Sequence, residues 1–190
     1  MLIIENKMKR EQNMYKERDL KAMQDETPRY NYFSGWVERI TNLRSGNTGE
    51  IDGCTKLYTL QDDQGSIVTF TVDVRTYFVD GYKVGVGSQI TCYYSTNAPV
   101  ILIYPPQYRA VVVSQNLNDR QIKVDRFDQN LTSADGTLSL SISSETNIEL
   151  ENGQSFEGNL AGRDLIVIYS SSTRSIPALT VPIEIIVMCP

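Results

Sequence analysis

The segment VGSQITCYY at residues 86–94, followed by STNAPVILIYPPQYRAVVV at residues 95–113, decides how the rest of the chain is interpreted. Ile90, Cys92 and Tyr94 occupy every second position of the first segment, which is the period of a half-buried strand. The run RAVVV at the end of the second segment predicts another strand. The prolines between the two runs exclude a central strand there, because proline has no amide hydrogen to donate to a ladder. The pattern therefore predicts a β unit with a projecting loop.

The same pattern occurs a second time, in AGRDLIVIYS at residues 161–170 and IEIIVM at residues 183–188. Three positions of the first segment recur 75 positions later: Gly87, Ile90 and Tyr94 correspond to Gly162, Leu165 and Tyr169. LSLSI at residues 138–142 likewise echoes residues 68–72, in which Val68, Phe70 and Val72 alternate. The chain is therefore predicted to contain an internal duplication, with a first unit at residues 31–114 and a second at residues 121–190.

Five short strands separated by turns in each unit predict an all-β fold of two tandem small OB-like β-barrels. In the first unit the predicted strands include residues 35–40, 57–60 and 66–72, and residues 41–56 are predicted to form a long polar loop. The connection TYFVDG at residues 76–81 is too short for the helix that usually follows the third strand of an OB fold. Another small closed barrel therefore remains an alternative.

Residues 1–30 differ from the rest in composition. The run KREQNMYKERDLKAMQDE is rich in helix formers and lacks glycine, so the segment is predicted to be an N-terminal arm that is either helical or loosely ordered. It does not have the pattern of a secretory signal, because its apolar run is short and the charges follow that run.

The composition excludes several classes of function. The net charge of −5 and the pI of about 4.8 disfavour nucleic acid as a partner, because phosphate binding needs concentrated Lys and Arg. The sequence has no run of about 18 apolar residues, so it predicts no membrane-spanning helix. Histidine is absent, which removes the commonest general base and the commonest metal ligand. We therefore expect no enzymatic activity, no catalytic residue, no metal site and no cofactor.

The candidate binding residues are aromatic and lie in and beside the proline loop: Tyr93, Tyr104, Pro105, Pro106 and Tyr108. Tyrosine offers a large contact area with a polar tip, and consecutive prolines hold the backbone extended. Tyr94 is assigned to the core because Tyr169 repeats it. The acids in the segments around Asp62 and Asp128, including Asp63 and Asp125, are interpreted as turn and surface residues because their spacing does not suit calcium. Cys92 is predicted to be buried, and the sequence leaves the redox state of Cys54 and Cys189 open.

Residues 76–113 resemble a group of uncharacterised tandem β-domain proteins of Gram-positive, clostridia-like bacteria. The resemblance rests on TYFV, the VG turn, an AP dipeptide and YPPQY, and it extends over about residues 33–188. It implies attachment to the cell envelope or an extracellular location, although no signal peptide is visible, and it implies no activity.

Three functions are compatible with these features. The first is a non-enzymatic structural or interaction module of the cell envelope or surface, with a protein partner or with self-association through the arm and strand edges into a homo-oligomer. The second is an OB-type binder of single-stranded nucleic acid, which the acidic composition disfavours. The third is a binder of a small ligand or carbohydrate that uses the tyrosines of the first unit.

Overall fold

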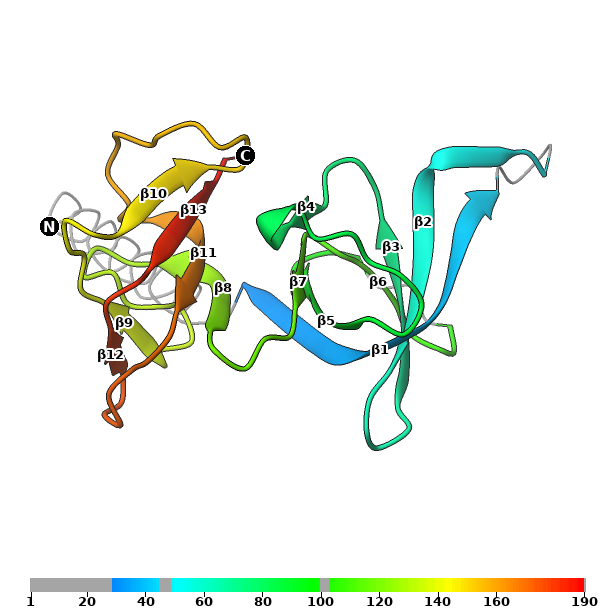
Figure 1. Ribbon diagram of the computed structural model, residues 1–190, viewed down its shortest axis with the longest axis horizontal. Coiled ribbons are helices and arrows are strands. Elements are labelled where there is room, and N and C mark those ends of the chain that lie inside the picture. The colour runs from blue at the N-terminus through cyan, green and yellow to red at the C-terminus, as the bar shows by residue number, and fades with distance from the viewer. Residues whose placement is uncertain (1–28, 45–48, 100–102, 190) are drawn as a thin grey trace, which may run out of the picture.

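The computed structural model describes residues 29–44, 49–99 and 103–189, and these residues form two lobes (Figure 1). The first lobe holds a seven-stranded sheet with the order β4-β7-β5-β1-β2-β3-β6. Its elements are β1 (Tyr30–Arg44), β2 (Ile51–Gln61), β3 (Ile67–Val72), β4 (Tyr77–Phe78), the short 3-10 helix η1 (Val79–Gly81), β5 (Gln89–Ser95), β6 (Gln107–Arg109) and β7 (Val112–Gln115). Most of the predicted N-terminal arm lies outside the described residues.

The second lobe holds a four-stranded sheet with the order β10-β13-β11-β8 and a separate pair, β12-β9. Its strands are β8 (Gln121–Phe127), β9 (Leu138–Leu140), β10 (Asn147–Leu150), β11 (Arg163–Tyr169), β12 (Ala178–Thr180) and β13 (Glu184–Met188). The all-β class predicted from the sequence is confirmed. Within the described ranges, no helix is long and apolar enough to cross a membrane.

The prediction of two OB-like barrels is wrong, because the strands are arranged as a β-solenoid of about three turns. Four ladders among the described residues are parallel, and each joins segments 35 to 40 residues apart, from Tyr77 with Val112 to Leu138 with Ala178. In each ladder the chain returns beside an earlier strand in the same direction, as successive turns of a solenoid do. Alternation and turn spacing locate single strands but not their partners, so the sequence pattern did not separate the two architectures.

Four ladders of the first lobe recur in the second, whereas the antiparallel pairs β1–β2 and β2–β3 occur only in the first. The antiparallel pairs β1–β5 and β5–β7 correspond to β8–β11 and β11–β13. The parallel pairs β3–β6 and β4–β7 correspond to β9–β12 and β10–β13. A threonine hydroxyl donates to a backbone carbonyl at the same place in each lobe, from Thr76 to Ala110 and from Thr146 to Pro182, both at 2.9 Å. The sequence repeat therefore corresponds to a repeated pattern of backbone pairing.

Buried apolar side chains form three clusters among the described residues. One lies within the first lobe and includes Phe70 and Cys92, and one lies within the second lobe and includes Phe127 and Leu165. The third joins the lobes, and we call it the shared core; its buried members are Val79, Tyr93 and Val112 of the first lobe and Val124, Ile166, Ile168 and Ile186 of the second. The two lobes are therefore held together by an apolar interior.

Strand β11 is buried on both of its faces. Leu165 and Val167 point into the cluster of the second lobe, whereas Ile166 and Ile168 point into the shared core. A strand with two buried faces needs apolar residues at successive positions. This explains why the second copy has the continuous apolar run LIVIY. Strand β3 differs, because its Val68, Phe70 and Val72 are buried as predicted and their neighbours are half-exposed, which gives the alternation.

The long polar loop predicted at residues 41–56 is also wrong, because most of it belongs to β1 and β2. These two strands pair beyond the core, with Thr41 opposite Leu57 and Arg44 opposite Ile51, and the hairpin projects from the first lobe (Figure 1). Most side chains near its end are exposed, so no apolar alternation marks these strands in the sequence. Backbone hydrogen bonds define the hairpin there.

Candidate functional site

The candidate residues predicted from the sequence do not form one site. Tyr108 is partly buried, stacks on Tyr94 with ring centroids 4.1 Å apart, and packs against the core of the first lobe. Tyr104 is 85% exposed. Pro105 and Pro106 are half-buried, and the carbonyl of Pro106 accepts a hydrogen bond of 2.9 Å from the amide of Thr69 in β3. The loop is therefore tied to the sheet, with one tyrosine facing solvent and the other packed on the core.

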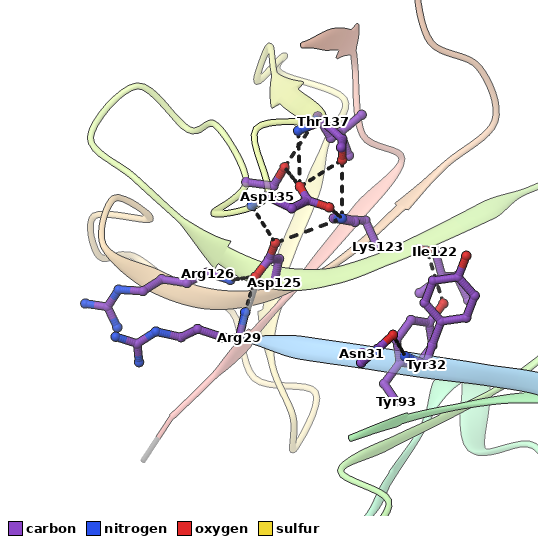
Figure 2. Close-up of polar contacts among 12 residues, drawn as sticks. Arg29, Asn31, Tyr32, Tyr93, Ile122, Lys123, Asp125, Arg126, Asp135 and Thr137 are labelled. Carbon is purple, nitrogen blue, oxygen red and sulfur yellow. Dashed lines mark hydrogen bonds and ion pairs between the residues drawn. The ribbon is translucent and has the colours of Figure 1, made fainter. Parts of the chain in front are cut away.

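Tyr93 lies elsewhere, at the junction of the lobes. It is 7% exposed, and its hydroxyl donates to the carbonyl of Ile122 at 3.0 Å, which links β5 to β8. Burial raises the pKa of Tyr93, so the phenol stays protonated and remains a donor. Its ring contacts that of Tyr32, with centroids 5.9 Å apart and an interplanar angle of 46°. Figure 2 shows the two rings beside Ile122.

A groove of about 560 Å³ begins at these rings, and we call it the tyrosine groove. Tyr32, Tyr93 and Tyr169 supply its aromatic surface, and Tyr32 is 63% exposed. Leu117 and Ile122 add apolar surface, and polar residues of both lobes supply the rest: Ser34, Thr91, Ser114, Gln115, Asn116, Gln121, Lys123, Asp135 and Thr137. Ligand sites combine apolar or aromatic surface with fixed polar groups, and they often occur at junctions between structural units.

A chain of hydrogen bonds orients one side of the tyrosine groove. The hydroxyl of Thr91 donates to Oδ1 of Asn116 at 2.6 Å. The hydroxyl of Ser34 lies 2.6 Å from that of Thr91 and, since the Thr91 proton is used, Ser34 donates to Thr91. Thr91 is buried, so this chain holds the Asn116 amide at the surface of the groove.

Two carboxylates that the sequence did not single out as a pair lie in the second lobe, Asp135 in the lining of the groove and Asp125 hydrogen-bonded to the amide of Asp135. Asp135 forms an ion pair with Lys123 and accepts hydrogen bonds from Ser133 and Thr137 (Figure 2). Burial raises the pKa of Asp135, but the hydrogen bonds from Lys123, Ser133 and Thr137 outweigh this and lower it to about 2. The carboxylate is therefore ionised and saturated with donors, which makes it a fixed acceptor and unsuited to proton transfer.

Asp125 is the second of these carboxylates, and it is 1% exposed. It accepts hydrogen bonds from the amides of Arg29, Arg126 and Asp135 at 3.2, 2.9 and 3.3 Å, and its Oδ2 lies 3.9 Å from Nζ of Lys123 (Figure 2). Burial raises its pKa, and the three amides oppose that effect. The interpretation of Asp125 as a surface acid is therefore wrong. The available signal was the place of this aspartate between Val124 and Phe127 in the run IKVDRF, because aspartate is uncommon within a strand.

The other polar candidates lie as the sequence predicts. Asp62 and Asp128 each accept two backbone amides within a turn, from residues two and four positions later. Cys92 is fully buried, and burial raises the pKa of its thiol. Within the described part of the chain, no group of three or more Cys, Asp and Glu side chains is placed to hold a metal ion.

Comparison with known proteins adds no assignment. No protein-family model matches the chain, and no curated protein matches its sequence. The resemblance to envelope-associated β-domain proteins stays a prediction.

Proposed function

We propose that this protein is a non-enzymatic binding module that takes an uncharged, polar ligand of the carbohydrate class in the tyrosine groove. One observation carries the proposal: Lys123 and Asp135 are the only charged residues that line the groove among the described residues, and they pair with each other. The lining therefore has no net charge to offer an ionic ligand. The exposed ring of Tyr32 suits the apolar face of a sugar ring, and the neighbouring hydroxyl and amide groups suit its hydroxyls.

The lack of net charge in the tyrosine groove also disfavours the alternative function, binding of single-stranded nucleic acid. A site for single-stranded nucleic acid combines stacking tyrosines with a basic groove, and the tyrosine groove supplies only the stacking surface.

The test is calorimetric titration of the full chain with a panel of neutral oligosaccharides built from glucose, galactose and N-acetylglucosamine. We expect saturable binding of at least one member, and Tyr32→Ala should weaken it about tenfold, which corresponds to about 1.4 kcal/mol. Tyr104→Ala is the matched control, because this tyrosine is also exposed but lies outside the groove. Absence of binding across the panel, or an equal loss in both variants, contradicts the proposal.

Association with a protein partner or with a second copy is a second candidate. The observation in its favour is a set of exposed apolar side chains on and beside β12, namely Ile142, Ile176, Leu179, Val181 and Ile183. Apolar side chains grouped on a surface favour protein contact over solvent. Light scattering after size exclusion tests self-association. We expect an oligomer that Leu179→Asp dissociates, and a monomer at every concentration contradicts self-association.

A further inference from the structure

The side-chain amide of Asn116 in the tyrosine groove is fixed in orientation and has unused donors. Asn116 directly follows β7, and its backbone amide donates to the carbonyl of Gln89 at 3.1 Å. Its Oδ1 accepts the proton of the buried Thr91 hydroxyl at 2.6 Å, so the amide cannot turn over without losing this bond. Nδ2 bonds to no acceptor among the described residues, and it is not buried. The donor end of the amide is therefore available to a ligand.

Other polar groups of the groove are either already bonded or not held. Asp135 pairs with Lys123 and accepts from the hydroxyl of Thr137 at 2.8 Å, so these three groups bond to one another. Gln121 also lines the groove, but no hydrogen bond between described residues holds its exposed side-chain amide. Asn116 differs from both kinds of residue, because its amide is held in place and its two N–H donors are unused.

Strand register places this amide beside the aromatic surface of the groove. In the β1–β5 ladder Tyr32 lies opposite Tyr93. Ser34, which donates to Thr91, lies opposite it in the same ladder. Residues two positions apart on a strand share a face and are about 7 Å apart. The hydroxyl pair that holds Asn116 is therefore the next pair on that face after the two rings, and a sugar ring stacked on Tyr32 has Asn116 within reach of its substituents.

A fixed N–H donor discriminates between the groups that a sugar carries. A hydroxyl both donates and accepts, so it bonds to either end of an amide, whereas a carbonyl only accepts. A ligand carbonyl therefore needs a donor, and Nδ2 of Asn116 supplies one that is already oriented. Leu117 and Ile122 line the groove and are half-buried, so they offer apolar surface to a methyl group. A carbonyl with a methyl group is the acetamido substituent of an N-acetylated sugar.

We propose that Asn116 determines the specificity of the tyrosine groove and selects sugars that carry an N-acetyl group over sugars that carry only hydroxyls. The inference rests on the proposed function, because it concerns the ligand of the same groove. Asn116 contacts the ligand, whereas Thr91 is a positioning residue that acts through Asn116. Without the Thr91 proton the amide turns, and its oxygen then meets the carbonyl of the ligand, which also only accepts.

The experiment is calorimetric titration of the full chain with two disaccharides, N,N′-diacetylchitobiose and cellobiose. They share the same rings and linkage, and they differ in an acetamido group or a hydroxyl at one carbon of each ring. We expect the wild type to bind diacetylchitobiose about tenfold tighter or more. Equal binding, or tighter binding of cellobiose, overturns the inference while the proposed function stands. If neither disaccharide binds, the inference is overturned, and the rest of the oligosaccharide panel decides the proposed function.

Asn116→Asp keeps the shape of the side chain and the oxygen that accepts from Thr91, but it replaces the two donors by a second acceptor. It should weaken binding of diacetylchitobiose about tenfold or more and change that of cellobiose little, because a hydroxyl can donate to the carboxylate. The matched control is Gln121→Glu, which makes the same change at an amide that is not held and should leave the ratio of the two affinities unchanged. An equal loss for both disaccharides in Asn116→Asp, or an equal change of the ratio in Gln121→Glu, contradicts the inference.

Thr91→Val tests the positioning role. Valine has a similar shape but no hydroxyl, so the affinities for the two disaccharides should become nearly equal, whereas Thr91→Ser keeps a hydroxyl and should retain the preference. A merely structural role would weaken binding of both disaccharides alike. A preference that survives in Thr91→Val overturns the positioning role, and if this variant fails to fold, Asn116→Asp decides the proposal.

Discussion

Replacement of Ile166 by alanine should destabilise both lobes, although the residue belongs to the second. Its side chain is 0% exposed and lies in the shared core with Val79, Tyr93 and Val112 of the first lobe. Truncation of a buried isoleucine to alanine costs about 2–5 kcal/mol, because apolar contact is lost and a cavity remains. With a urea dependence of about 2–3 kcal/mol per molar for a chain of this size, the midpoint should fall by about 1–2 M.

Trp36 makes the experiment selective. It is the single tryptophan of the chain and lies in β1 of the first lobe, so its fluorescence reports a lobe that the substitution does not alter. Urea unfolding followed by Trp36 fluorescence and by far-ultraviolet circular dichroism should give coincident transitions in the wild type and in Ile166→Ala. The control is Ile142→Ala, whose side chain is exposed, and it should cost less than about 1 kcal/mol. An unchanged fluorescence midpoint in Ile166→Ala, or two separate transitions, refutes the coupling of the lobes and favours two independent units.

Two further predictions concern the tyrosines of the proline loop and the ion pair of the tyrosine groove. Tyr108→Ala should lower the free energy of unfolding by about 2–4 kcal/mol, because its ring packs on Tyr94 and on the core of the first lobe. The exposed Tyr104 should tolerate the same change within about 0.5 kcal/mol. Thermal melting compares the two variants, and equal losses of stability contradict the assignment of Tyr108 to the core. Asp135 has a pKa of about 2, below its ordinary 3.8, so its contribution to stability is full above about pH 4 and is lost as the pH falls toward 2. The Asp135→Asn variant should therefore be less stable than the wild type by about 1 kcal/mol at pH 6, after allowance for solvent screening, and equally stable near pH 2. Urea unfolding at both pH values measures this, and a stability difference that is independent of pH contradicts its origin in the Asp135 carboxylate.

The sequence predicted individual strands best where one face is buried and the other is not. In β3 the alternation of Val68, Phe70 and Val72 marks the strand directly. In β11 and β13 the apolar runs are continuous because both faces are buried, and their length still identifies strands. The outer part of the β1–β2 hairpin was missed because mostly exposed polar side chains carry no such signal.

The strand order and the tyrosine groove could not be obtained from the sequence, because both depend on contacts between distant segments. The order of the strands depends on ladders between segments 35 to 40 residues apart, which local alternation does not encode. The tyrosine groove likewise combines Tyr32 of β1 with Lys123 of β8 and Asp135 of a later turn. Of the predicted candidates only Tyr93 lies there, and its contact with Ile122 depends on how the lobes pack.

The distribution of the three cysteines makes the chain suited to site-directed labelling without mutagenesis. Cys92 lies in the core of the first lobe, where burial keeps its thiol protonated and inaccessible to a thiol-reactive probe. Cys54 is exposed on the projecting hairpin, and Cys189 is exposed directly after β13 of the second lobe. A pair of spin labels would thus attach to one residue of each lobe, and the distance between them would report directly on any change in lobe orientation.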